Sequence, residues 1–390
     1  MRRSEQRILT THAGSLIRPR AVSEFDIARR DGRAVDEAAY DAALQHAVAE
    51  VVRHQADVGV DIVDDGEFSK SSWGTYINQR VSGFEHDPDR RVPINYRGRD
   101  AERFAEFFES DAAAVGTTPR RRRMGADVCV GPIVYTDHHS IQRDIQHLKA
   151  AADAAGVEEA FLPVVAPASA AFNAINQYYA SDEDYVYALS EALRQEYLAI
   201  TDAGLLLQVD DAVLANAYDD LMARGRDVYR TWAEVRIGAL NHALRGIPPD
   251  RVRYHLCYGS WHAPHMADAP LEDIVDLILR VNAGAYSIEA ANVRHEHEWR
   301  VWETVTLPEG KSLIPGVVTH HTLSVEHPRL VADRIVRYAR IVGRENVIAG
   351  TDCGFQQGAG TERVHPTVMW AKLQTLAEGA RLASQELWPD

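Results

Sequence analysis

The sequence predicts an α/β protein built as a (β/α)8 TIM barrel with an insertion after the second strand. Eight short runs rich in apolar and β-branched residues alternate with longer segments of helical periodicity, as strands and crossover helices do in a parallel barrel. No glycine-rich phosphate loop follows the first run, which disfavours the competing open, doubly wound sheet. The chain of 390 residues is long enough for one large α/β domain, and it has no repeat of roughly 20 to 50 residues.

Each predicted strand is an apolar run that ends at a turn or a polar residue, and each predicted helix carries apolar residues every three or four positions. Prolines mark helix boundaries: Pro249 follows the end of one helix, and Pro270 and Pro328 open two others. In chain order, the predicted strands are 8–15, 60–67, 161–168, 205–211, 252–257, 285–289, 313–319 and 346–353. The predicted helices are 36–58, 139–155, 182–203, 230–246, 271–281, 328–343 and 366–387.

The stretch 84–127 interrupts this alternation, because it is charged and only weakly periodic. A ninth β-like run, 128–135, follows it. We therefore expect an insertion over 84–135 that ends in a hairpin, within a single domain that spans residues 1–390.

Composition excludes several classes of protein. The formal net charge of −15 disfavours a nucleic-acid partner, which would require a basic face. The charged start of the chain lacks the apolar core of a signal peptide, and no apolar run approaches the roughly 20 residues of a membrane span, so we expect a cytoplasmic protein with no membrane partner. Three cysteines in such a chain argue against a disulfide framework and leave a metal site or a reactive thiol open.

Polar side chains with metal-binding chemistry gather where the predicted strands end, which in a barrel is one rim. His255 and Cys257 are two residues apart, so they point to the same side of their strand. Cys353 and Glu289 stand at the ends of two other strands. One nitrogen, two sulfurs and one oxygen are typical ligands of Zn²⁺. Two buried free cysteines and a core histidine are the alternative explanation.

A zinc ion with two thiolate ligands suits one reaction in particular. The metal lowers the pKa of an incoming thiol and keeps it as a nucleophilic thiolate, and a weakly bound carboxylate can leave to make room for it. A hydrolytic zinc site more often has several histidines and an open water position. The ligand set therefore predicts alkyl transfer to or from sulfur.

With these residues in place, the chain resembles the cobalamin-independent methionine synthase superfamily, specifically its C-terminal catalytic barrel. The segments that carry this resemblance are 10–15, 64–67, 208–210, 255–257, 288–289, 315–317 and 352–354. Within this superfamily, the chain is more similar still to a short branch that includes epoxyalkane:coenzyme M transferase. The segments shared with that branch are 176–179, 240–245, 289–292, 325–328 and 348–355.

The resemblance implies a role for each matching residue. It implies that Glu67 and Asp210 hold the amino group of a homocysteine-like thiol, that Ser15 meets its carboxylate, and that His321 delivers a proton to the leaving group. Because side chains alternate along a strand, we expect His320 to point to the other side, and Asp210 is the next candidate for the catalytic proton donor. The implied zinc ligands are the four residues already named: His255, Cys257, Glu289 and Cys353.

The sequence therefore predicts an enzyme, a zinc-dependent thiol alkyltransferase or methyltransferase that acts on a small thiol and an alkyl donor. Three alternatives stay open. One is an epoxide:coenzyme M-type transferase, in which Arg122 and Arg123 offer a cation to a sulfonated thiol. The others are a zinc-dependent C–S lyase and a non-catalytic, zinc-stabilised binding subunit. Segment 166–171 lacks the tryptophan expected of a folate-binding platform, which leaves the alkyl donor open. The sequence also leaves open the identity of the thiol, the direction of the reaction and assembly into a homo-oligomer.

Overall fold

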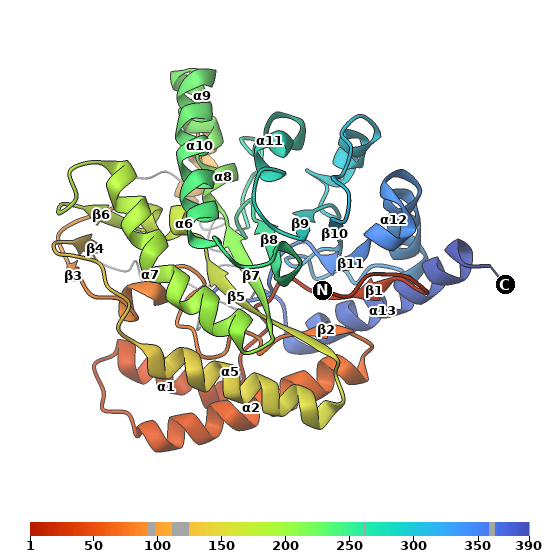
Figure 1. The fold of residues 1–390 in the computed structure, drawn as a ribbon, viewed down its shortest axis with the longest axis horizontal. Helices are drawn as coiled ribbons and strands as arrows, with labels where there is room; N and C mark the ends of the chain where they lie inside the picture. The colour runs from red at the N-terminus through yellow and green to blue at the C-terminus, as the bar shows by residue number, and fades with distance from the viewer. Residues whose placement is uncertain (93–97, 111–124, 261, 359–362, 390) are drawn as a thin grey trace.

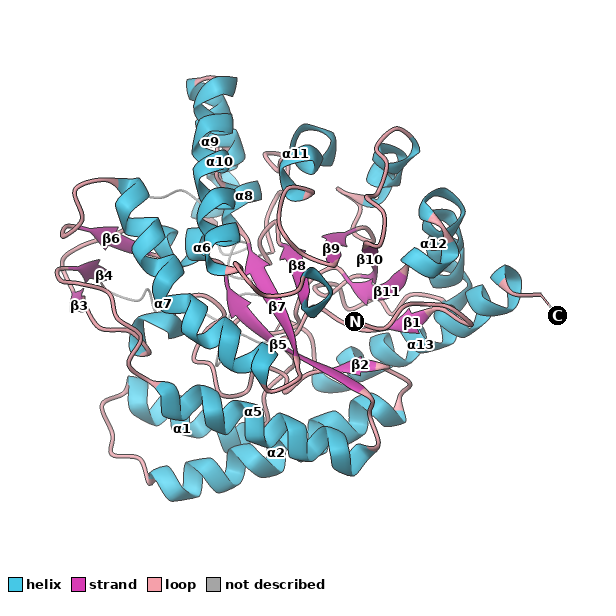
Figure 2. Ribbon diagram, in the orientation of Figure 1, coloured by secondary structure: helices cyan, strands magenta, loops and turns pink. Residues whose placement is uncertain are grey.

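The computed structural model describes residues 1–390 except 93–97, 111–124, 261, 359–362 and 390. Eight parallel strands lie at the centre of the molecule, and helices surround them (Figure 1; Figure 2). Their order in the sheet is β1-β11-β10-β9-β8-β7-β5-β2. These strands are β1 (Leu9–Thr10), β2 (Ile62–Val63), β5 (Glu159–Val165), β7 (Leu206–Asp211), β8 (Val252–Leu256), β9 (Ala285–Glu289), β10 (Ser312–Val318) and β11 (Ile348–Thr351).

The two edges of this sheet, β1 and β2, meet and close it into a barrel. The Asp61 N–H donates to the Thr10 carbonyl at 3.1 Å, and the Thr11 hydroxyl donates to the Ile62 carbonyl at 2.9 Å. The predicted (β/α)8 fold is confirmed.

One layer of the barrel interior draws a side chain from each of the eight strands. Strand β8 contributes Arg253, which is fully buried and has its guanidinium carbon 3.8 Å from the centre of the Phe161 ring. Arg253 donates to Thr11 Oγ1 at 2.9 Å and to the His12 carbonyl at 2.7 Å. The layer is therefore a packed floor, not a channel, and the site must lie above it. Its apolar members are Leu9, Ile62, Phe161, Leu206, Ala285, Ile314 and Ile348.

The outer helices follow the predicted positions closely, with boundaries shifted by a few residues. The sequence missed the amphipathic helix α1 and several short helices of the connecting loops, which are too short for a periodic signal. The longer helices are α1 (Arg20–Arg30), α2 (Glu37–Asp57), α5 (His138–Ala155), α7 (Asp182–Asp202), α10 (Arg226–Ala243), α11 (Leu271–Ile278), α12 (Pro328–Val342) and α13 (Pro366–Leu387). The short ones are α3 (Asp100–Arg103), α4 (Ala105–Glu109), α6 (Pro167–Phe172), α8 (Val213–Asn216) and α9 (Tyr218–Arg224). None of the helices in the described ranges is long and apolar enough to cross a membrane.

A second, three-stranded sheet lies beside the barrel near α7, in the order β3-β4-β6 (Figure 2). The insertion supplies β3 (Phe84–Asp87) and β4 (Ala126–Cys129), which pair antiparallel, while β6 (Ala174–Asn176) joins β4 in parallel. Of the β-like run 128–135, only the start is strand, and its partner β3 lies well before it in the chain. The pair is therefore not a tight hairpin, although Val81 and Tyr135 extend it by one bridge. The extent of the single domain stays a prediction.

Candidate metal and thiol site

Strand β8 supplies two of the predicted metal ligands. His255 lies on β8 and Cys257 directly follows it, on the same side of the strand as Arg253 below them. Cys353 follows the end of β11. Ligand atoms of these three residues all lie within 4.8 Å of one another, and the Cys257 and Cys353 sulfurs are 3.4 Å apart as free thiols. The structure thus brings together three of the four predicted ligands at the carboxyl rim.

The contacts around these three residues fit a thiolophilic metal ion. The His255 Nε2 atom is buried without a hydrogen bond of good geometry in the described part of the chain, while Nδ1 lies 3.3 Å from Ser287 Oγ. The Gly259 N–H donates to Cys257 Sγ at 3.2 Å, and the Ser260 hydroxyl donates to Cys353 Sγ at 3.0 Å. Donors aimed at sulfur stabilise thiolates, and one imidazole with two thiolates is a donor set for zinc.

Glu289, the fourth predicted ligand, ends β9 and is buried beside this group, but its carboxylate is bonded elsewhere. Its Oε1 accepts from the Tyr258 N–H at 3.2 Å, and its Oε2 accepts from Asn292 Nδ2 at 2.7 Å. Coordination by Glu289 therefore stays a prediction.

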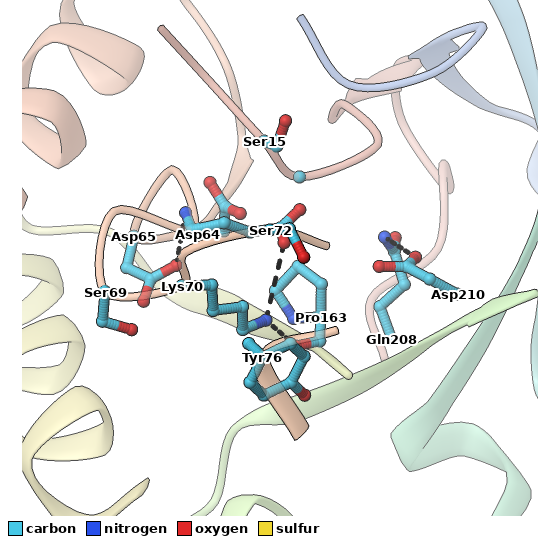
Figure 3. A network of polar contacts seen from close by, with 12 residues as sticks. Ser15, Asp64, Asp65, Ser69, Lys70, Ser72, Tyr76, Pro163, Gln208 and Asp210 are labelled. Carbon is cyan, nitrogen blue, oxygen red and sulfur yellow. Dashed lines mark hydrogen bonds and ion pairs between the residues drawn. The ribbon is translucent and has the colours of Figure 1, made fainter. Parts of the chain in front are cut away.

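The two predicted amino-group contacts, Glu67 and Asp210, are buried close to one another. Burial, and next the charge of Glu67, raise the pKa of Asp210 to about 7, while the nearby His255 opposes this rise. Gln208 Nε2 donates to Asp210 Oδ1 at 2.8 Å and to the Ala13 carbonyl at 2.7 Å. Figure 3 shows this Gln208–Asp210 pair across from the loop that follows β2. The structure thus places an acidic pair within electrostatic reach of His255 and its group at the carboxyl rim.

Lys70 is a buried cation of this pocket that the sequence analysis missed. Its Nζ donates to the Pro163 carbonyl, as Figure 3 shows. The same nitrogen lies 3.6 Å from Glu67 Oε2 and 5.0 Å from the centre of the Tyr76 ring. A lysine three residues after the acidic motif resembles an ordinary surface residue, so no local pattern marks it.

The loop after β2 holds Glu67 in a constrained backbone conformation. Glu67 has a φ of 59°, unusual for a residue with a side chain. Side-chain oxygens of Asp64 and Asp65 accept from the Gly66 and Glu67 N–H groups at 2.8 and 2.9 Å. A Cβ at Gly14 would lie 2.9 Å from Glu67 Oε1, so glycine is needed where the β1 loop meets this carboxylate.

Ser15 connects two loops of the rim. Its hydroxyl donates to the Gln356 carbonyl and accepts from the Gln356 N–H at 3.2 Å, and its carbonyl accepts from the Phe355 N–H at 2.7 Å. Ser15 therefore ties the loop after β1 to the segment after Cys353, and its contact with a substrate carboxylate stays a prediction.

His320 and His321 follow β10 with unequal burial. His320 is 2% exposed, and neither ring nitrogen has a hydrogen-bond partner in the described ranges. Burial, and next the neighbouring His321, lower the pKa of His320 well below its ordinary value. Burial and His262 lower the pKa of His321 to about 4, and these two rings meet edge-on at 5.5 Å. The structure thus buries His320 more deeply than His321, and the assignment of His321 to the side that faces the metal ligands stays a prediction.

Two predicted substrate contacts, Arg122 and Arg123, lie outside the described residues. Segment 166–171, which has no tryptophan for a folate-binding platform, lies mostly in helix α6, where Ala168 and Ala170 are buried. Among the described residues, the sequence analysis also missed Gln208 and Asn292 as polar neighbours of the site. Both lie in segments that carry the family resemblance, but only the structure shows that Gln208 binds Asp210 and Asn292 binds Glu289.

Fold and site together define a (β/α)8 barrel whose carboxyl rim carries an imidazole, two thiols and an acidic pair. The family model of the cobalamin-independent synthase catalytic domain matches residues 87–372, most of the chain. The chain belongs to this family.

Several known proteins are similar to the chain over most of their length. A methionine synthase of Thermococcus kodakarensis is 23% identical over 381 residues, covering 97% of this chain and 94% of the relative. An uncharacterised protein, YxjH, of Bacillus subtilis is 24% identical and covers 93% and 91% of the two chains. Among solved structures, the B12-independent methionine synthase from Shewanella sp. W3-18-1, in complex with selenomethionine, superposes with a TM-score of 0.73 at 18% identity and covers 98% of this chain and 99% of that one. This last likeness concerns the fold alone.

Proposed function

We propose that the protein transfers a methyl or other alkyl group to the sulfur of a small thiol at a zinc ion. His255, Cys257 and Cys353 would hold the ion, with Glu289 as a replaceable fourth ligand. The observation that carries this proposal is the convergence of two free thiols and one imidazole at the rim of the barrel. Family membership and the similarity to methionine synthases support the same reaction class.

The metal ion, when bound, would lower the pKa of the incoming thiol and hold its thiolate as the nucleophile. The chain's own residues would orient that thiol. Glu67 and Asp210 would bind an ammonium group at the other end of the substrate, because two buried carboxylates favour a cation, and Gln208 keeps Asp210 in place.

A histidine after β10 would supply the proton to the leaving group. The resemblance assigns this role to His321. His320 is the alternative, since it is buried with no hydrogen-bond partner in the described ranges and has His255 among its neighbours. Burial lowers the pKa of both rings, so the ring that acts would first take up the proton that the incoming thiol loses when it becomes a thiolate, and would then pass it to the leaving group.

The thiol would be homocysteine-like, as the acidic pair and the methionine synthase relatives suggest. A coenzyme M-like thiol is the second candidate, and a specific observation favours it. Lys70 already places a buried ammonium 3.6 Å from Glu67, where it partly satisfies that carboxylate and offers a positive charge to an anionic thiol.

Zinc K-edge X-ray absorption of the zinc-loaded protein, with homocysteine and with coenzyme M, tests the proposal. We expect two zinc–sulfur bonds without thiol and a third with the true substrate, each at about 2.3 Å. Cys129→Ser is the matched control, because Cys129 is a buried free thiol in the insertion and should leave the spectrum unchanged. A zinc shell that keeps two sulfurs with both thiols, or contains none, would refute the proposal.

A further inference from the structure

The carboxylate of Glu289 lies in a defined polar niche of its own. One oxygen accepts from the Tyr258 backbone N–H at 3.2 Å, and the other accepts from Asn292 Nδ2 at 2.7 Å. The three residues whose ligand atoms converge within 4.8 Å do not include Glu289. The niche therefore stabilises a position of this carboxylate that differs from that of a ligand converging with His255 and the two cysteines.

The amide of Asn292 can take only one orientation. Its Oδ1 accepts from the backbone N–H groups of Arg294 and His295, both at 3.0 Å. Its Nδ2 must therefore face the carboxylates, where it donates to Glu289 at 2.7 Å and lies 3.3 Å from Asp352 Oδ2. Asn292 is 8% exposed, so water does not readily replace it.

A buried cation lies behind the same niche. His295 is hydrogen-bonded through Nδ1 to Glu298 at 2.8 Å and through Nε2 to Asp268 at 3.0 Å. Burial alone would lower the pKa of His295, but these two partners and the charge of Glu289 raise it to about 10, so the ring is an imidazolium at neutral pH. The ring stacks on the side chain of Tyr258 at 3.9 Å between centres, and the backbone N–H of the same residue binds Glu289. This hydrogen-bonded ring therefore holds Tyr258, and with it the N–H that binds Glu289.

We propose that Asn292 and the Tyr258 N–H receive the Glu289 carboxylate when a thiol displaces it from the metal ion, which makes Asn292 a positioning residue for thiol binding. The inference rests on the proposed zinc–thiol function. A tetrahedral zinc ion with three protein ligands has one further position, for which Glu289 and the thiol compete. A niche that stabilises the displaced carboxylate lowers the free-energy cost of thiol binding by the same amount.

The variant Asn292→Asp isolates this contact. The new side chain keeps an oxygen for the Arg294 and His295 N–H groups, but presents a carboxylate to Glu289 in place of the amide donor. In the zinc-loaded full chain, we expect the thiol that adds a third sulfur in the wild type to bind about tenfold or more weakly, the loss expected for one hydrogen bond to a charged group. Zinc content should stay at the wild-type level, and zinc should be retained at least as well against a chelator, because Glu289 now favours the metal.

A double-mutant cycle separates this role from a structural one. In the Glu289→Ala background, Asn292→Asp should no longer weaken thiol binding, since the carboxylate to be received is gone. Asn241→Asp is the control, because that amide bonds the Arg280 carbonyl and the Asn282 N–H on the outside of the barrel. Wild-type thiol affinity in Asn292→Asp, loss of its zinc, or an equal loss of thiol affinity in both backgrounds overturns the inference. A wild type that binds neither zinc nor thiol refutes the proposed function instead.

Discussion

The change Gly316→Ala tests how closely the fold and the site are coupled. A Cβ at Gly316, on β10, would lie 2.5 Å from the N, Cα and Oδ1 atoms of Asp352. Ordinary contacts begin about 1 Å further out, so the backbone after β11 must move. That movement would displace the neighbouring Cys353 and weaken the bonds by which Asp352 Oδ1 accepts from the Ala290 and Ala291 N–H groups at 2.7 and 2.9 Å.

Overpacking of this kind costs about 1–3 kcal/mol, and a weakened hydrogen bond adds about 1 kcal/mol. We therefore expect the free energy of unfolding in urea to fall by about 3 kcal/mol, and zinc affinity to fall with it because Cys353 has moved. Gly131→Ala is the matched control: its nearest neighbour would be the Gly83 Cα at 3.8 Å, an ordinary contact. Gly316→Ala with wild-type stability and wild-type zinc affinity would refute the reasoning.

Three further predictions concern the site. Cys257→Ser and Cys353→Ser should each greatly reduce bound zinc measured by metal analysis while the protein keeps its circular dichroism, because the barrel core does not depend on the metal; full zinc in both variants would contradict the assignment. His320→Asn and His321→Asn should separate the proton donor from its neighbour, with the true acid losing about 10²–10⁴-fold in rate at unchanged zinc content and thiol binding; wild-type rates in both variants would place the donor elsewhere. Asp210→Asn should abolish thiol binding, yet raise the free energy of unfolding at pH 8 by about 1 kcal/mol or more. In the unfolded chain, Asp210 loses its proton near its ordinary pKa of about 4. In the folded protein, burial and Glu67 raise this pKa to about 7, so Asp210 destabilises the fold as the pH rises from 4 to 7. If the free energy of unfolding in urea changed with pH equally in variant and wild type over this range, the prediction would be wrong.

Local patterns in the sequence already determined much of the site. His255 and Cys257 could be assigned to one face from their spacing alone, because side chains alternate along a strand. Glu289 and Cys353 could be assigned to the same rim because each stands at the end of a predicted strand, and all parallel strands of a barrel end on one side.

Local sequence patterns did not predict the lengths of strands β1 and β2. The segments 8–15 and 60–67 are apolar runs typical of strands, yet β1 ends at Thr10 and β2 at Val63. The remaining residues form loops whose shape depends on glycine and on contacts between them, such as the close approach of Gly14 to Glu67. Propensity reports a residue's preference in isolation, whereas these loops are shaped by partners far away in the chain.

Only the tertiary structure decided how the polar groups around the site are paired. Lys70 beside Glu67, Asn292 on Glu289, and His320 buried with no partner in the described ranges depend on three-dimensional distances between separate loops. The sequence determined which chemical groups reach the rim, since strand periodicity and strand ends are local properties. Their hydrogen bonds, burial and charge balance were decided by the packing of loops after different strands, because these interactions vary steeply with distances that no local pattern contains.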